Sequence, residues 1–162
     1  MVARARIETP ADPRDLAGDF AHTVAIEVRF ADTDAMGHVN NAVYLTYCEM
    51  ARIRYWTDVT GEPVSAGHEG AESLILAEAR ITYRAPVFHS ETVTVETRAT
   101  HIGRSSFTLE HRLTACGPGG SPRLVATSDS VMVRYDYVAD RSAPLSPAHI
   151  DAIETFEGRA LR

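Results

Sequence analysis

Five segments of the chain have the pattern of strands. In the first, third and fourth of them hydrophobic and polar residues alternate, as in strands that bury one face and expose the other, and the second and fifth are rich in aliphatic residues. These segments are Thr23–Asp32, Ser73–Arg84, Glu91–Ile102, Ser105–Ala115 and Arg123–Tyr137. In the first segment, the apolar side chains expected to share the buried face are Val24, Ile26, Val28 and Phe30. Glycine or proline lies between the last four segments, so we expect short turns to join them.

A helical period governs the residues between the first and the second predicted strand. From Asn41 to about Val59 no proline or glycine occurs, and apolar residues recur three to four positions apart. Asn40 or a neighbour is the expected N-cap, and Gly61 and Pro63 end the helix. Because apolar residues lie on more than one side of this helix, we expect other structure to enclose it.

A second helix is predicted from Pro147 to Gly158, with Ser146 as its N-cap. It is polar and late in the chain, so we expect it to be peripheral. One strand, one enclosed helix and four successive strands predict an α+β fold, in which an antiparallel sheet of about five strands wraps around one long central helix. The predicted organisation is an N-terminal tail (1–20), a main domain (21–140) and a C-terminal peripheral helix (141–162).

The composition is that of an ordinary globular domain, with 44% hydrophobic and 23% charged residues. No stretch approaches the roughly 18 apolar residues of a membrane span. The N-terminus lacks the apolar segment of a signal peptide, which predicts a cytoplasmic protein. The net charge of −6 argues against a nucleic-acid partner. Two distant cysteines, and seven histidines without ligand spacing, predict no metal site.

Polar side chains gather in the turn directly ahead of the predicted central helix. They are Asp32, Asp34, His38, Asn40 and Asn41, with a glycine, Gly37, that can adopt a positive φ angle. We expect the rest of the chain to wrap the helix and to present a ligand to its start.

This turn also carries a family resemblance. The run Asp-Thr-Asp-Ala-Met-Gly-His-Val-Asn-Asn (32–41), followed by Tyr44 and Glu49, resembles the hotdog-fold acyl-CoA thioesterases of the 4-hydroxybenzoyl-CoA thioesterase type. Two later runs are similar to the same group, Ile-Thr-Tyr-Arg-Ala-Pro (81–86) and Ile-Gly-Arg-Ser-Ser (102–106). The similarity covers roughly residues 22–137. It implies the hotdog fold, whose sheet curls around a central helix, and an activity that needs no metal or organic cofactor.

By this resemblance Asp34 corresponds to the catalytic carboxylate of the family, and the implied reaction is hydrolysis of an acyl-CoA thioester to a free carboxylate and CoA. Asp34 would act either as a nucleophile that forms a mixed anhydride or as a general base on water. Backbone N–H groups near Asn40 and Asn41 would polarise the thioester carbonyl, helped by the helix dipole. Asp32 is expected to shape the turn.

Three neighbouring polar side chains have more than one interpretation. His38 matches a histidine of plant acyl-carrier-protein thioesterases, although Met36 stands where those enzymes have asparagine. His38 would therefore either orient a water or hydrogen-bond the turn. Asn40 would cap the helix or hold a water. Some hotdog thioesterases use a glutamate of this helix as the base, but they lack an aspartate at the position of Asp34. Glu49 is therefore expected to be structural and ion-paired with Arg52 or Arg54.

The turn after the third predicted strand is the candidate for the nucleotide end of CoA. Arg104 can bind a phosphate with its planar fork, and Ser105 and Ser106 add hydrogen-bond donors. Arg84 is a second candidate. An acidic protein that binds polyanionic CoA needs such a local basic patch.

Other functions are compatible with this fold. An acyl-carrier-protein substrate presents the same phosphopantetheine arm as CoA. Enoyl-CoA hydratases and dehydratases of the hotdog type pair an aspartate with a histidine, typically as Asp-x-Asn-x-x-His, whereas Asp34 and His38 lie one residue closer together and that asparagine is absent. A noncatalytic acyl-CoA-binding module is a further alternative, which the intact Asp34 disfavours. Hotdog sites usually form between subunits, so the resemblance also implies a homodimer or a homotetramer.

Overall fold

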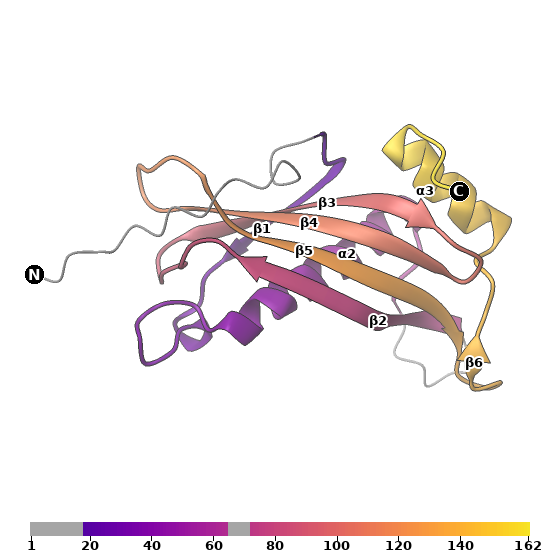
Figure 1. Cartoon of the computed structure of the whole chain (residues 1–162), viewed down its shortest axis with the longest axis horizontal. Coiled ribbons are helices and arrows are strands. Elements are labelled where there is room, and N and C mark those ends of the chain that lie inside the picture. Colours follow the sequence, from indigo (N-terminus) through magenta and orange to yellow (C-terminus); the bar gives the residue numbers. More distant parts are fainter. Residues whose placement is uncertain (1–17, 65–71) are drawn as a thin grey trace, which may run out of the picture.

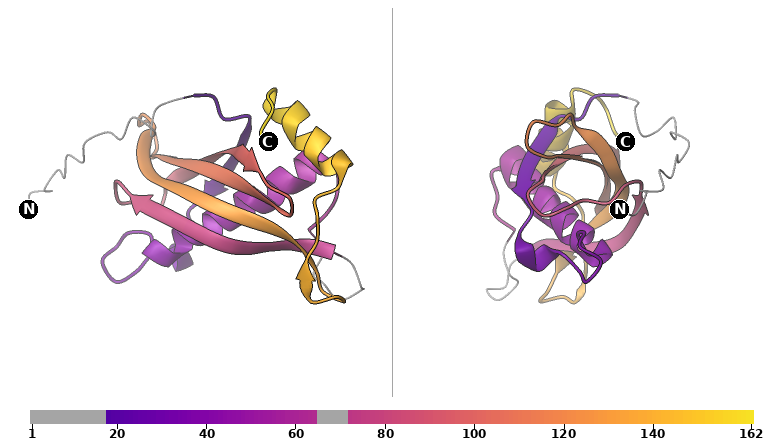
Figure 2. Two further views of the ribbon diagram at one scale, coloured as in Figure 1. Left: turned by 45° about the vertical axis from the view of Figure 1, so that its right-hand side comes forward. Right: turned by 90° about the vertical axis from the view of Figure 1, so that its left-hand side faces the viewer.

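The computed structural model describes residues 18–64 and 72–162. Within this part of the chain one antiparallel sheet curls around the long helix α2 (Asn41–Thr60), and the shorter helix α3 (Pro147–Glu157) covers one end (Figures 1 and 2). The strands are β1 (His22–Glu27), β2 (Glu72–Tyr83), β3 (Thr92–Ile102), β4 (Ser106–Cys116), β5 (Arg123–Asp136) and the short β6 (Arg141–Ser142). Their order is β1-β3-β4-β5-β2, with β6 beside β5. The predicted sheet wrapped around one long helix is confirmed.

β1 is shorter than the strand that the alternation predicted. Val28 is buried as expected, but Phe30 is 81% exposed and begins the 3-10 helix η1 (Phe30–Asp32). The chain leaves the extended conformation there because the Asp32 carboxylate accepts a hydrogen bond from the Arg29 N–H at 3.0 Å, which closes a tight turn. The predicted buried face therefore extends only to Val28, and the placement of Phe30 on it is wrong.

α2 begins and ends at the predicted residues. The Asn40 side chain accepts a hydrogen bond from the Ala42 N–H at 2.9 Å, so Asn40 is the N-cap. Gly61 ends the helix with a φ of 74°, a conformation that a glycine adopts without strain. The buried residues of the helix are Tyr44, Tyr47, Cys48, Ala51, Arg52, Tyr55 and Trp56.

The opposite face of α2 is open in the single chain. Leu45, Met50 and Ile53 are 37%, 47% and 41% exposed, so the expectation that other structure encloses the helix is wrong for one chain alone. The helix lies closer to β1 and β3 than to β2. Leu76 of β2 lines a groove of about 160 Å³ with α2 on its other side, and is itself 41% exposed. Apolar side chains gathered in this way mark a surface that another molecule can cover.

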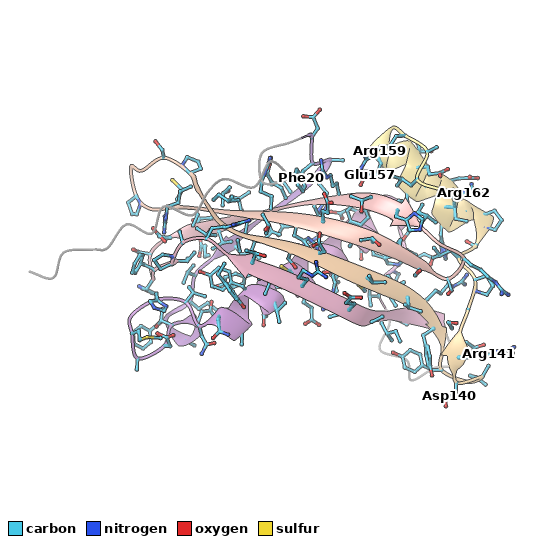
Figure 3. The ribbon with its side chains drawn as sticks, in the orientation of Figure 1. Phe20, Asp140, Arg141, Glu157, Arg159 and Arg162 are labelled. Carbon is cyan, nitrogen blue, oxygen red and sulfur yellow. The ribbon has the colours of Figure 1, made fainter. Side chains whose placement is uncertain are left out.

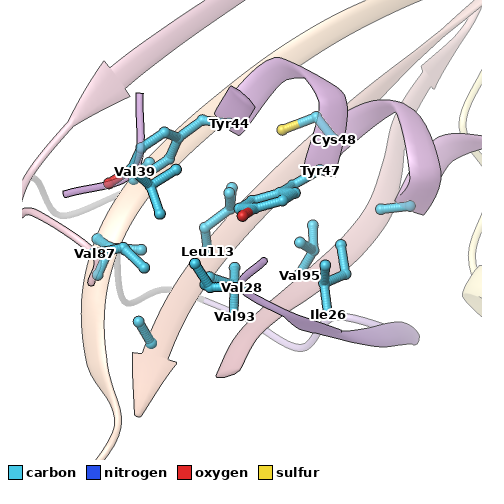
Figure 4. Close-up of a cluster of buried hydrophobic side chains, with 14 residues drawn as sticks. Ile26, Val28, Val39, Tyr44, Tyr47, Cys48, Val87, Val93, Val95 and Leu113 are labelled. Atoms are coloured by element: carbon cyan, nitrogen blue, oxygen red, sulfur yellow. The ribbon is translucent and has the colours of Figure 1, made fainter. Parts of the chain in front are cut away.

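Two apolar clusters fill the space between α2 and the sheet. The first surrounds Tyr44 and Tyr47 near the start of the helix (Figure 4). The second surrounds Trp56 and Phe107, whose rings stack with centroids 5.7 Å apart. The clusters are separated by buried polar side chains at one register of the sheet: His22, Thr97, His111 and Ser128. Burial, reinforced by the charge of Arg52, lowers the pKa of His111 to about 3, so this imidazole is neutral at neutral pH.

α3 packs into the core beside the C-terminal half of α2, although its polar sequence suggested a place at the periphery. Ile153 of α3 is fully buried. One carboxylate oxygen of Glu157 accepts hydrogen bonds from the Tyr55 hydroxyl and from the Ala99 N–H, each at 2.7 Å. Figure 3 shows Glu157 and Arg159 at the C-terminal end of α3. The Arg159 guanidinium donates a hydrogen bond to the Ala99 carbonyl at 2.8 Å. These bonds join α3 to α2 and to β3.

The predicted N-terminal tail falls mostly on residues outside the described part of the chain, as does most of the predicted loop from 61 to 71. Neither helix of the described part is long and apolar enough to cross a membrane. The same described residues contain no group of three or more histidine, cysteine, aspartate or glutamate side chains that could hold a metal ion.

Candidate active site

The turn between η1 and α2 is a tight loop that carries Asp34. The Asp34 N–H donates to the His38 carbonyl at 2.9 Å, and the Gly37 N–H donates to the Asp34 carbonyl at 3.0 Å. Gly37 has a φ of 81°, which the turn requires and which other residues rarely adopt. Thr33 and Val39 pair across the base of the loop as an isolated bridge. These bonds give the loop a defined shape.

The Asp34 carboxylate is only partly engaged. Its Oδ1 accepts a hydrogen bond from the Met36 N–H at 2.8 Å, while its Oδ2 lies 3.7 Å from His38 Nδ1. That second separation is too long for a hydrogen bond, so a bridging water or a small movement would be needed to join the two groups. The side chains of Asp34 and His38 are 19% and 33% exposed. One carboxylate oxygen beside an imidazole is thus open to a ligand.

Asp32 has the opposite character. It is 1% exposed, and its carboxylate accepts hydrogen bonds from the Arg29 guanidinium at 2.6 Å and from the Tyr47 hydroxyl at 2.9 Å. The hydrogen bonds from Arg29 hold the pKa of Asp32 below its usual range. Burial, together with the Asp32 carboxylate, raises the pKa of Tyr47. Asp32 therefore builds the turn and ties it to α2, as predicted.

The start of α2 has an N–H group without an acceptor among the described residues. The Asn40 N–H donates to the Asp32 carbonyl at 2.9 Å, and the Ala42 N–H donates to Asn40 Oδ1. The Val43 N–H donates to the Asn40 carbonyl at 2.9 Å. The N–H of the first helical residue, Asn41, has no acceptor within its own helix and finds none elsewhere in the described part. Of the two backbone N–H groups expected to polarise the thioester carbonyl, those of Asn40 and Asn41, only that of Asn41 is without an acceptor among the described residues.

Tyr83, which the sequence interpretation did not single out, contacts this first helical residue. Its hydroxyl donates a hydrogen bond to the Asn41 carbonyl at 2.8 Å. The Tyr83 ring meets the Tyr44 ring edge-on, with centroids 5.2 Å apart. Tyr44 is itself buried, and burial raises the pKa of its hydroxyl to about 12. Tyr83 belongs to the run 81–86 that carries part of the resemblance. No local pattern could pair it with Asn41, because 42 residues separate the two.

The turn between β3 and β4, which carries Arg104, Ser105 and Ser106, lies at the opposite end of the sheet from the segment that leads into α2 (Figure 1). The Asp34 turn adjoins the segment just before β3, since the Val39 N–H donates to the Val87 carbonyl at 2.7 Å. The turn with Arg104 follows the other end of β3, whose 11 residues span roughly 35 Å. Within one chain the structure does not bring Arg104, Ser105 and Ser106 to Asp34.

Arg84 lies at the same end of the sheet as Asp34 but on the outer surface of the sheet. Its N–H donates to the Val125 carbonyl at 2.8 Å, just past the end of β2. Its side chain lines a cavity of about 60 Å³ with Phe20, Arg80 and Arg112. Figure 3 labels Phe20, whose ring packs 4.5 Å from the Arg112 guanidinium. A ligand bound to Arg84 would therefore lie across the sheet from the core side.

Glu49 does not join the turn. It lies two helical turns beyond Asn41, is 55% exposed and approaches Arg52 at 3.5 Å, as the expected structural ion pair. The Arg52 side chain is 8% exposed.

Comparison with known proteins gives a consistent set of relatives. The family model described as Thioesterase-like superfamily matches residues 28–153. A 1,4-dihydroxy-2-naphthoyl-CoA hydrolase from Synechococcus elongatus is 30% identical over 122 residues, which are 73% of this chain and 84% of the relative.

Solved structures of the same kind superpose over most of the chain. A thioesterase from Thermus thermophilus, in complex with coenzyme A and zinc, has a TM-score of 0.75 and 37% sequence identity, over 88% of this chain and 98% of that chain. The 4-hydroxybenzoyl-CoA thioesterase from Pseudomonas sp. strain CBS-3 has a TM-score of 0.73 over 80% of this chain and 96% of that chain. Its sequence identity is 21%, so that likeness is one of fold.

Proposed function

The chain belongs to the thioesterase-like superfamily, and on that basis we propose that it hydrolyses an acyl-CoA thioester to a free carboxylate and CoA. One observation carries the proposal: the partly open Asp34 carboxylate lies in the turn that leads directly to the Asn41 N–H, which has no acceptor among the described residues. Cleavage of a thioester needs an attacking oxygen and a donor for the developing oxyanion, and this turn supplies both.

Two routes fit these groups. In the first, Asp34 attacks the thioester carbonyl, the thiolate leaves, and water hydrolyses the mixed anhydride that forms on Asp34. In the second, Asp34 takes a proton from the attacking water, and that proton passes to the departing thiolate. In both routes the carbonyl oxygen gains negative charge beside the Asn41 N–H, where the positive end of the α2 dipole adds to the stabilisation.

His38 and Asn40 support this arrangement in different ways. His38, whose Nδ1 lies 3.7 Å from Asp34 Oδ2, would orient the attacking water or hold the carboxylate. Asn40 uses its side chain to cap the Ala42 N–H, so the Asn41 N–H is the donor left for the substrate.

The assembly that supports this function is a homodimer, or a homotetramer built from it. β2 is a 12-residue edge strand, and beside it lies the open face of α2. Antiparallel pairing of two β2 strands about a two-fold axis would carry the turn with Arg104, Ser105 and Ser106 toward the Asp34 of the partner subunit. Those three residues could then bind the phosphates of a CoA whose thioester lies in the partner's site. Arg84, at the Asp34 end of its own chain, is the second phosphate candidate and would bind on the outer surface of the sheet.

Free-thiol release from a panel of acyl-CoAs, with wild type and Asp34→Ala, tests the proposal. We expect wild type to release thiol from at least one of the short, long and aromatic substrates, and Asp34→Ala to release almost none. Asp151→Ala, at an exposed position on α3, is the matched control and should behave as wild type. A wild type that binds CoA but is inert across the panel would overturn the enzyme proposal. Consumption of an enoyl-CoA without thiol release would favour hydration, and preference for the acyl-carrier-protein form would reassign the carrier.

A further inference from the structure

We propose that Tyr83 is a positioning residue for the thioester site, because its hydroxyl holds Asn41 in place and the Asn41 N–H is the proposed oxyanion donor. The inference rests on the proposed function and adds to it a residue from a strand that is distant in the sequence. Tyr83 need not touch the substrate for this role, since it acts through Asn41.

The residue that offers the free N–H is held from both sides. On the upstream side, the Asn40 N–H donates to the Asp32 carbonyl at 2.9 Å. On the downstream side, the Tyr83 hydroxyl donates to the Asn41 carbonyl at 2.8 Å. The first turn of a helix frays readily because its leading N–H groups have no intrahelical acceptors. Two anchors around Asn41 limit that fraying and keep its N–H in one direction.

Tyr83 is itself well supported. It is the last residue of β2 and pairs with Ala126 of the neighbouring strand β5. Its ring packs edge-on against Tyr44, which is 3% exposed and whose hydroxyl lies 3.4 Å from the Ala85 carbonyl. The position of the Tyr83 hydroxyl is therefore set by the sheet and the first apolar cluster, and it transfers their rigidity to the start of α2.

The effect of losing this hydroxyl should fall on rate more than on stability. Tyr83 is 42% exposed in the single chain, so water can replace the hydrogen bond there and the fold of the subunit loses little. An oxyanion donor, in contrast, must stand within a few tenths of an ångström of its working position, and a displacement of about 1 Å can cost on the order of 100-fold in rate. The same motion leaves ground-state binding of the substrate largely unchanged, since the donor works mainly in the transition state.

Tyr83→Phe tests the inference, because it removes the hydroxyl and keeps the ring. We expect kcat for thiol release to fall roughly tenfold while KM stays within about twofold, and the melting temperature to stay at the wild-type value. The matched control is Tyr137→Phe, a tyrosine of similar exposure (45%) whose ring packs on Tyr135 near the end of β5. It should keep wild-type kcat and KM.

A measurement that needs no turnover separates this inference from the proposed function. The Ala42 and Val43 N–H groups, which bond to Asn40 in the same first turn, report its fraying. Hydrogen exchange at these two amides should be several-fold faster in Tyr83→Phe than in wild type or in Tyr137→Phe. Unchanged exchange and unchanged kcat in Tyr83→Phe would overturn the positioning role, as would a fall in kcat that merely follows a lower melting temperature. Loss of the proposed function appears differently, as a wild type without thiol release or an Asp34→Ala variant that retains it.

Discussion

At the C-terminal end of α2, the Tyr55 hydroxyl and the Glu157 carboxylate bond to each other inside the fold. At the N-terminal end, Asp34 Oδ2 and the Asn41 N–H have no hydrogen-bond partner among the described residues. One helix thus has an end whose polar groups are satisfied internally and an end whose polar groups are left open.

The surroundings of the two ends of α2 also differ, because apolar side chains are covered at the C-terminal end and exposed at the N-terminal end. Trp56 is stacked on Phe107 within the second apolar cluster, and α3 covers that end of the helix. At the other end Phe30 and Met36 are 81% and 75% exposed beside the Asp34 turn. Polar groups that a protein satisfies internally add to stability, whereas groups that it leaves open are available to a ligand. The closed end therefore stabilises the fold, and the open end is the one whose polar groups are available to a ligand.

The largest expected effect comes from Asp34→Asn at the open end. Replacing the carboxylate by an amide removes the proposed nucleophile or base, so kcat for thiol release should fall on the order of 1,000-fold. The free energy of unfolding in urea should change by less than about 0.5 kcal/mol, because the carboxylate is only partly engaged. A large loss of stability in this variant would mean that the open end is structural too.

Glu157→Ala at the closed end should lower the stability of the fold and leave kcat unchanged, which is the reverse of the effect of Asp34→Asn. It leaves the Tyr55 hydroxyl and the Ala99 N–H buried without an acceptor, which we expect to cost about 2–3 kcal/mol in the free energy of unfolding. The kcat per folded molecule should remain that of wild type. Asp151→Ala, at an exposed position on the same helix, is the control for both measurements. A fall in kcat of the folded Glu157→Ala protein would show that the two ends are coupled.

His111, in the polar row between the two clusters, predicts a pH dependence of stability. Its pKa is lowered to about 3 in the folded protein, against about 6.5 in the unfolded chain. Between these values the unfolded chain binds more protons, so stability rises with pH, and acidification from pH 6 to pH 4 should cost up to about 1.4 kcal/mol per pH unit from this group. Urea unfolding across that range should give a shallower slope for His111→Leu than for wild type. Equal slopes would contradict the prediction.

The smallest expected effect is that of Phe30→Ser. Phe30 is 81% exposed, and its ring meets that of His89 edge-on with centroids 5.9 Å apart. Its replacement should therefore change the free energy of unfolding by less than about 0.5 kcal/mol. Chemical denaturation measures this directly. If the free energy of unfolding fell by more than about 2 kcal/mol, that result would contradict the exposed position and support the buried position that the alternation predicted for Phe30.

Features that depend on neighbouring residues could be predicted from the amino-acid sequence alone. Asn40 as the cap of α2, Gly61 as its end and the positive φ of Gly37 all follow from hydrogen bonds and torsion angles within a few positions. The alternation along β3, β4 and β5 follows from one face being buried, and with the central helix it predicted the fold. Local spacing also gathered Asp34 and His38 in one turn, and their roles stay predictions.

Which distant groups meet depends on the tertiary structure. Tyr83 reaches Asn41 across 42 residues, and Tyr55 reaches Glu157 across 102, because strand pairing and helix packing set those contacts. The same pairing places Arg104 and Asp34 at opposite ends of β3, although both belong to runs that carry the resemblance. A sequence pattern records which face a residue buries but not which partner it finds there, since that partner is chosen by the packing of the whole chain.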